Sequence, residues 1–347
     1  MSPSPAASGA LCILLLFALS CGPGPGLEAA AAQAGLQVDL RGSIGGSVHH
    51  HWSGDAPSGT VGIVDGRLEV SVELNRRWRA AFTFEPRLQA GFTAGDEAVS
   101  GSAGFTEGYI AYRTGAADLL AGRLLMPLET ARLAAPYSLT PPDAAGRREG
   151  LFGARADVYV GSSRLQAGAL QLGDRWTAAV SLRRAFAGWE ATGHLVAQEQ
   201  GPVAGLGFSS LVGQVVAYGE VWSVPGETAL RFGAGARGFL GALLWTAEIA
   251  RAPWSPGAEP VPQAGFQLAY APFPWLGLAL DGSVAHFHGS PGDPPSAPAQ
   301  VPAHRWGLGA VYEVVPGVSE LEFSFGRLAP PFVAASHTAG LGFRYYF

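Results

Sequence analysis

Residues 339–347 decide the class of fold, and they read Ala339-Gly340-Leu341-Gly342-Phe343-Arg344-Tyr345-Tyr346-Phe347. Apolar or aromatic side chains occupy every odd position, while glycine, arginine and tyrosine occupy the even ones. Successive side chains of a β-strand point to opposite faces of the sheet. This stretch therefore predicts a strand that separates an apolar medium from a polar one.

The same period of two recurs from Leu36 to the end of the chain. It is clearest in residues 67–74, 77–92, 175–183 and 320–325, where charged or hydroxyl side chains alternate with apolar ones. No helical stripe competes with this pattern. The sequence predicts an all-β protein made of consecutive antiparallel strands.

The connections between these strands fall into two alternating kinds. Short turns are expected near Arg76, Gly115, Ser162, Gly188, Val212, Phe239, Phe273 and Pro316. Longer links are expected over 49–60, 94–103, 127–150, 252–262 and 288–303, and three further links near Gly173, Gly201 and Gly226 are short. Short turns on one side and longer loops on the other are typical of membrane barrels. The spacing predicts an up-and-down barrel of about 18 strands, with 16 or 14 as open alternatives.

The C-terminal strand, with Phe347 as its last residue, resembles the closing strand of Gram-negative outer-membrane β-barrels. The resemblance implies that the barrel-assembly machinery reads Phe347 and that outer-membrane lipid surrounds the strands. A secreted β-sandwich is the alternative, because its strands also alternate. The unbroken series of strands and the aromatic residues near strand ends, such as Trp78, Trp176 and Trp306, favour the barrel.

The first 34 residues have the composition of an export signal. An apolar run from Ala10 to Leu19 is too short to span a bilayer as a helix and precedes a cleavage motif, Ala32-Gln33-Ala34. Cleavage before Cys21, with lipidation, is an alternative. We therefore expect a signal peptide over residues 1–34 and a barrel over residues 35–347. The net charge of −5 and the absence of a basic patch argue against a nucleic-acid partner.

A barrel of 16 to 18 strands encloses an aqueous channel, so the polar faces of the strands should line it. Arginines outnumber acids among the inward positions up to Arg183, and acids outnumber arginines after it. We expect mixed charges to hydrate the wall and to disfavour lipophilic solutes. The predicted pore-lining residues are Arg67, Glu69, Glu73, Arg77, Arg79, Glu85, Arg87, Arg155, Asp157, Arg175, Arg183, Glu220, Glu248, Asp281, Glu313, Glu320 and Glu322.

The longest connection, 127–150, combines four prolines with several charges. The segment from Gly122-Arg123 to Pro142-Asp143 resembles the one after the fifth strand in several porin families, including phosphate-selective ones. In trimeric porins the third loop narrows the channel, so the resemblance implies a constriction loop and a homotrimer; a loop exposed on the surface is the alternative. The candidate constriction residues are Glu129, Arg132, Asp143, Arg147 and Arg148.

Few residues suggest chemistry. The run His49-His50-His51 is expected in a solvated loop, without the cysteine or second cluster of a metal site. Ser181 and His194 lie on inward faces of neighbouring predicted strands, which leaves a hydrolase open, but no G-x-S-x-G turn accompanies them. Residues 233–238 match G-x-G-x-x-G only by letters, because no helix follows. We expect no cofactor, no metal and no enzymatic activity.

Together these patterns predict a porin-like channel in the outer membrane of a Gram-negative bacterium. It would pass small hydrophilic solutes down their gradient. The rival functions are a selective channel for an anion or an exported polysaccharide, an outer-membrane hydrolase, and a structural or adhesive barrel.

Overall fold

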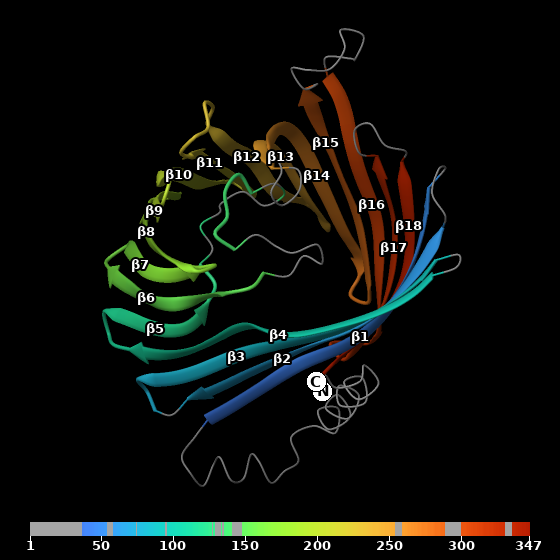
Figure 1. Ribbon diagram of the computed structural model, residues 1–347, viewed down its shortest axis with the longest axis horizontal. Coiled ribbons are helices and arrows are strands. Elements are labelled where there is room, and N and C mark those ends of the chain that lie inside the picture. Colours follow the sequence, from blue (N-terminus) through green and yellow to red (C-terminus); the bar gives the residue numbers. More distant parts are fainter. Residues whose placement is uncertain are drawn as a thin grey trace.

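In the computed structural model, eighteen antiparallel strands among the described residues form one sheet that closes on itself (Figure 1). The structure describes residues 37–53, 58–73, 75–93, 96–126, 128, 133, 135–140, 148–253, 259–288, 300–329 and 335–347. Each strand pairs with its neighbours in sequence, and β1 also pairs with β18. The predicted all-β, up-and-down barrel of about 18 strands is confirmed. Among the described residues, no helix is long and apolar enough to cross a membrane.

The strands are β1 (Gln37–Ser53), β2 (Gly59–Glu73), β3 (Trp78–Thr93), β4 (Asp96–Arg113), β5 (Ala117–Leu124), β6 (Leu151–Val160), β7 (Ser163–Leu172), β8 (Arg175–Phe186), β9 (Trp189–Gln198), β10 (Gly201–Val212), β11 (Val215–Ser223), β12 (Arg231–Leu240), β13 (Leu243–Pro253), β14 (Pro260–Phe273), β15 (Leu276–His288), β16 (Gln300–Val315), β17 (Ser319–Ala329) and β18 (Ser336–Tyr346).

The barrel closes where β1 pairs with β18, the strand that contains most of the C-terminal stretch 339–347. Gly42 and Phe347 exchange two backbone hydrogen bonds, of 2.9 and 3.0 Å between nitrogen and oxygen. A Cβ added to Gly42 would lie 2.4 Å from Cζ of Phe347, so the terminal ring packs over this glycine. Phe347 therefore extends the pairing of β1 with β18 by one residue, and its ring packs over Gly42 because glycine has no side chain.

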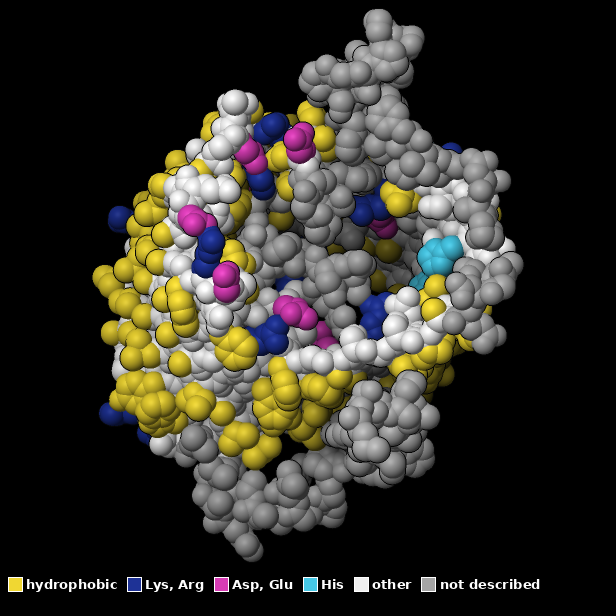
Figure 2. Space-filling model, viewed as in Figure 1, with side chains coloured by type: hydrophobic (Ala, Val, Ile, Leu, Met, Phe, Trp, Pro, Cys, Tyr) yellow, Lys and Arg dark blue, Asp and Glu magenta, His cyan; other side chains and the backbone are white. Residues whose placement is uncertain are grey.

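The two faces of the sheet differ as the alternation predicts. On β8, Trp176, Val180 and Leu182 are exposed on the outside, while Thr177 and Ser181 are buried on the inside. Hydrophobic side chains cover much of the visible outer surface, and charged ones surround the central hollow (Figure 2). Such an outer band suits a bilayer, where every backbone group of a spanning sheet must be paired internally.

Aromatic side chains gather at both rims of this outer band. At the rim of short turns, the rings of Trp78 and Tyr112 lie 4.8 Å apart, as do those of Phe273 and Trp275. At the opposite rim, which we call the loop rim, Trp52 stacks on His337 at 5.5 Å. Aromatic girdles of this kind mark the two interfaces of a membrane barrel.

Most short turns fall where the sequence predicts them. For example, β8 and β9 are joined at Gly188, whose φ of 77° lies in the left-handed region that glycine tolerates best. Two predicted connections are wrong. The link over 94–103 is much shorter, because β4 already begins at Asp96 and pairs with β3 from there.

The prediction of a solvated loop at His49–His51 is also wrong, because this run lies in β1. His49 pairs with Gly340 of β18 and with Val61 of β2, so two neighbours hold it in the sheet. Because side chains alternate between the two faces along β1, His49 and His51 point into the lumen and His50 points outward. The predicted signal peptide, residues 1–34, lies outside the described residues and stays a prediction.

Candidate functional site: the lumen and its inserted loop

The connection between β5 and β6 enters the barrel, where Figure 1 shows part of it crossing the ring of strands. We call residues 125–150 the inserted loop. Its apolar side chains join buried side chains of the inner wall in one cluster. The members are Leu124, Met126, Leu128, Tyr137 and Leu139 from β5 and the loop, and Leu170, Ala179, Val196, Val203 and Trp222 from β7 to β11. The loop therefore covers one side of the lumen.

Trp222 of β11 is the largest side chain of this cluster and is fully buried. Its ring lies 4.8 Å from that of Tyr137 in the loop and is stacked at 5.1 Å on His194 of β9. Burial of an aromatic ring of this size provides a large share of the hydrophobic stabilisation at a contact. The tryptophan is thus the main apolar anchor of the loop.

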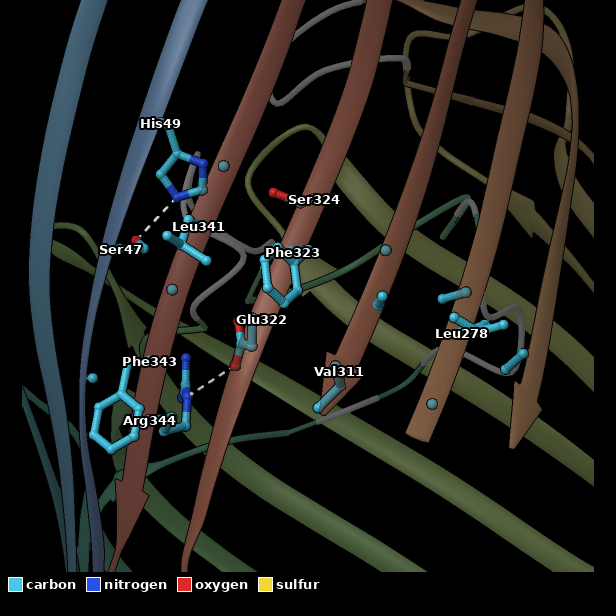
Figure 3. A pocket seen from close by; sticks show the side chains of 18 of the residues that line it. Ser47, His49, Leu278, Val311, Glu322, Phe323, Ser324, Leu341, Phe343 and Arg344 are labelled. Carbon is cyan, nitrogen blue, oxygen red and sulfur yellow. Dashed lines mark hydrogen bonds and ion pairs between the residues drawn. The ribbon is translucent and has the colours of Figure 1, made fainter. Parts of the chain in front are cut away.

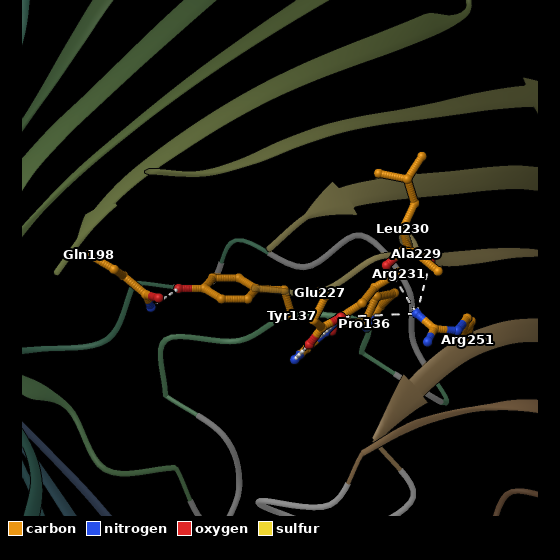
Figure 4. A network of polar contacts seen from close by, with 8 residues as sticks. All are labelled: Pro136, Tyr137, Gln198, Glu227, Ala229, Leu230, Arg231 and Arg251. Atoms are coloured by element: carbon orange, nitrogen blue, oxygen red, sulfur yellow. Dashed lines mark hydrogen bonds and ion pairs between the residues drawn. The ribbon is translucent and has the colours of Figure 1, made fainter. Parts of the chain in front are cut away.

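Polar contacts hold the same part of the loop (Figure 4). Gln198 Nε2 donates a hydrogen bond to Tyr137 Oη at 2.9 Å, and Arg231 Nη1 donates one to the carbonyl of Pro136 at 3.1 Å. Arg231 also forms an ion pair with Glu227, at 2.5 Å. Burial raises the pKa of Tyr137 to about 12, so its phenol stays neutral in ordinary buffers. The loop therefore receives polar contacts from two strands of the wall, β9 and β12.

The loop reaches β13 and β14, where the side chain of Leu133 lies next to Gly265. Glu248 accepts a hydrogen bond from the backbone nitrogen of Leu133 at 3.2 Å and another from Tyr218 Oη at 3.0 Å. At the loop's start, Arg155 Nη1 donates to the carbonyl of Leu125 at 2.7 Å. Hydrogen bonds to charged groups are stronger than neutral ones. These contacts tie two described residues of the loop, Leu125 and Leu133, to the inner wall at β6 and β13.

The inner wall at β2, β3, β6 and β7 carries ion pairs in rows. Arg67 contacts Glu69 at 2.6 Å and Glu85 at 3.0 Å. Farther round, buried Asp157 lies 3.2 Å from Arg155 and 2.9 Å from Arg164. The register places these partners on adjacent strands or two residues apart on one strand, so opposite charges meet on the same face.

The side of the lumen formed by β14–β18 and β1–β3 is open. It holds a cavity of about 780 Å³ that is lined by residues from both groups of strands (Figure 3) and also by Phe239 of β12 and Leu244 of β13. Within it, Arg344 Nε lies 3.3 Å from Glu322 Oε1, and His49 shares a hydrogen bond of 3.0 Å with Ser47 Oγ. A second cavity of about 280 Å³ lies along β1–β4, beside Arg41 and Arg79.

The structure places most of the predicted pore-lining residues on inward positions of strands. These are Arg67, Glu69, Glu73, Arg79, Glu85, Arg87, Arg155, Asp157, Arg175, Arg183, Glu220, Glu248, Asp281, Glu313, Glu320 and Glu322. Arg77 differs, because it lies in the turn before β3 and donates a hydrogen bond of 3.5 Å to Tyr112, on the outer face.

Of the five candidate constriction residues, the structure describes one. Glu129, Arg132, Asp143 and Arg147 lie outside the described residues, while Arg148 is half-buried at the end of the loop. The loop does enter the lumen, through apolar residues that were not among the candidates.

Sequence reasoning also missed Arg164 and Trp222. Trp222 shares the inward face of β11 with Tyr218 and Glu220, and a large aromatic ring on such a face is a signal of contact inside the barrel. The polar lining predicted for the lumen is therefore incomplete, because part of the inner wall is apolar.

The two residues that could suggest a hydrolase are both described by the structure. Ser181 and His194 are direct neighbours across β8 and β9, both are buried, and His194 stacks on Trp222. Among the described residues, no three histidine, cysteine, aspartate or glutamate side chains gather in a way that could hold a metal ion.

No known protein family and no curated protein matches this sequence. Solved structures with similar folds do exist. OpdQ of Pseudomonas aeruginosa superposes with a TM-score of 0.63 at 9% identity, over 90% of this chain and 99% of its own. OccK7 (OpdD) of the same organism gives 0.64 at 11% identity, over 90% and 98%. OccAB4 of Acinetobacter baumannii gives 0.62 at 8% identity, over 90% and 98%.

The likeness extends over almost the full length of these proteins and concerns the fold. It agrees with the closed sheet, the outer apolar band and the two aromatic rims described above. The chain therefore has the fold of these structures, a closed antiparallel β-barrel with 18 strands among its described residues.

Proposed function

We propose that this protein is an outer-membrane channel through which small hydrophilic solutes diffuse passively. The observation that carries the proposal is the one-sided position of the inserted loop. Described residues of the loop contact the inner wall from β6 to β14, while β15–β18 and β1–β3 line a cavity of about 780 Å³. Barrels of 16 to 18 strands characteristically enclose aqueous channels.

The lining of the open side supports passage of polar solutes. Arg87, Glu322 and Arg344 face the cavity, so a solute that sheds part of its hydration can find charged partners there. Both signs of charge are present, which favours a weakly selective channel over one dedicated to anions. We propose no catalytic step, because Ser181 and His194 are both buried and His194 stacks on Trp222.

Liposome swelling with sugars of graded size tests the proposal. Purified protein should admit small sugars at rates that fall steeply with size, as expected for a channel narrowed by a loop. Conductance in planar bilayers, measured in a salt gradient, should show weak ion selectivity. A barrel that is folded by circular dichroism yet admits no sugar and carries no current would exclude a channel, and strong anion selectivity would favour the selective rival.

A further inference from the structure

Gly342 of β18 lies at the centre of a group of polar side chains on the open side of the lumen. Its direct partners across the sheet are Ser47 of β1 and Glu322 of β17, both labelled in Figure 3. A Cβ added to Gly342 would lie 3.3 Å from Cβ of Ser47 and 3.7 Å from Cβ of Glu322. The two side chains therefore flank the glycine, which leaves a recess between them in the cavity of about 780 Å³.

Two further side chains border one end of this recess. Gly340, two residues from Gly342, pairs with His49 of β1 and Ser324 of β17. A Cβ added to Gly340 would lie 2.5 Å from Nδ1 of His49 and 2.6 Å from Oγ of Ser324, so the ring nitrogen and the hydroxyl converge on one point. The other ring nitrogen of His49, Nε2, shares a hydrogen bond of 3.0 Å with Ser47 Oγ. Nδ1 is therefore the atom that His49 directs toward this point.

Arg344 borders the opposite end of the recess. Its Nε lies 3.3 Å from Glu322 Oε1, and the two side chains are 34% and 40% exposed, so both are accessible from the lumen. The ion pair carries no net charge. A carboxylate has two acceptor oxygens and a guanidinium has five N–H donors, so one contact between them leaves hydrogen-bonding capacity on both. The group is therefore electrically balanced and rich in donors and acceptors.

These side chains are close enough together to contact one small solute. They belong to three adjacent strands, and the two strand spacings from β1 to β17 amount to about 10 Å. We call the group the polar recess, which consists of Ser47, His49, Glu322, Ser324 and Arg344 around Gly340 and Gly342. A hydroxyl group both donates and accepts hydrogen bonds, so a solute with several hydroxyl groups matches this mixture of donors and acceptors.

We propose that the polar recess is a binding section of the channel for neutral monosaccharides. One hydroxyl of the sugar contacts His49 Nδ1 and Ser324 Oγ together, and neighbouring hydroxyls contact Glu322 and Arg344. An ionic solute would lose hydration without meeting an uncompensated charge, because Glu322 and Arg344 already neutralise each other. This inference rests on the proposed channel function and adds a solute class to it.

Block of single-channel current in planar bilayers tests the inference with four probes, after correction for the bulk conductivity of each solution. D-Glucose should reduce the current at a concentration about tenfold below that of tetraethylene glycol, a neutral solute of similar mass with fewer hydroxyl groups. It should also act at lower concentration than D-gluconate and D-glucosamine, which have a similar carbon skeleton and a single charge. Equal block by glucose and tetraethylene glycol, or stronger block by a charged probe, would overturn the inference.

Variants assign the effect to the polar recess. His49→Ala and Ser324→Ala should each raise the blocking concentration of glucose toward that of tetraethylene glycol. His50→Ala is the matched control, because this neighbouring side chain of β1 points outward. Gly342→Ala places a methyl group between the flanking side chains and should also weaken the block by glucose. Its control is Gly46→Ala on the outer face, where an added Cβ would meet its nearest atom at 3.7 Å.

The outcomes separate the two proposals. Absence of any current or sugar uptake by the wild-type barrel removes the channel function itself. Normal current and sugar uptake, with block by glucose unchanged in His49→Ala and Ser324→Ala, removes only the binding section. Heat-modifiable migration in gels verifies that each variant barrel has folded before its current is measured.

Discussion

The inner wall of this barrel has two regions that share one alternation pattern and differ in side-chain size. Under the inserted loop, the inward positions hold large apolar groups such as Leu170, Val196 and Trp222, all fully buried. On the open side, inward positions such as Ala279 and Gly309 are small. Large buried groups such as Trp222 therefore provide contacts for the loop, while small residues such as Ala279 and Gly309 leave room in the lumen.

The contrast has a physical reason. A strand that faces water on its inside gains nothing from a large apolar side chain, whereas a strand that receives a loop buries it at roughly 25 cal/mol per Å² of apolar surface. The loop in turn needs this burial to offset the conformational entropy lost when its residues are ordered. Anchor and loop stabilise each other, and the width of the channel follows from their contact.

The largest expected effect comes from removal of the anchor on the covered side. Trp222→Ala leaves a cavity between Tyr137 and His194 and should cost about 3–5 kcal/mol of loop-docking free energy. The loop should then leave the wall, with higher protease sensitivity and a changed, noisier single-channel conductance. Trp176→Ala, on the lipid-facing side, is the control and should leave both readouts unchanged. An unaltered channel in Trp222→Ala would show that other contacts suffice to hold the loop.

An effect of intermediate size is expected from two matched substitutions, one in each region of the inner wall. Ala179→Leu adds volume to a fully buried position under the loop, and such overpacking should cost about 1–3 kcal/mol. Ala279→Leu adds the same volume on the open side, where it should narrow the lumen and lower conductance with little change in thermal stability. Ala178→Leu, on the outer face of β8, serves as control.

Melting curves and conductance should therefore separate the two alanines. A loss of thermal stability in Ala279→Leu equal to that in Ala179→Leu would contradict the division into a covered and an open wall.

The smallest expected effect concerns the hydroxyl of Tyr137. Tyr137→Phe loses the hydrogen bond from Gln198 and should weaken docking by about 1 kcal/mol. Because burial raises the pKa of this phenol from 10.0 to about 12, docking should be fully stable below pH 10 and weaken as the pH rises from 10 toward 12. The released phenol ionises more readily than the docked one.

Single-channel noise measured between pH 8 and 11 should therefore increase above pH 10 in the wild type. The increase that belongs to this phenol should be missing in Tyr137→Phe. If the noise of the wild type and of Tyr137→Phe depends on pH in the same way, ionisation of the Tyr137 phenol does not affect docking of the loop.

Much of the barrel could be predicted from local sequence. The period of two fixes which side chains face lipid, and glycine-containing turns such as the one at Gly188 fix where the chain reverses. Two errors arose where this signal is weak. Residues 94–103 are mostly small and polar, and three histidines at 49–51 carry no clear alternation, so pairing with neighbouring strands decided that both regions are largely strand.

The sequence by itself determined a closed sheet with an apolar outside, because alternation and turn chemistry act between residues that are close along the chain. Only the tertiary structure decided which part of the inner wall is covered. Tyr137 meets a partner 61 residues away and Pro136 one 95 residues away, and no periodicity records such contacts. Closure of the barrel brings these residues together, so the free path through the protein depends on packing across its lumen.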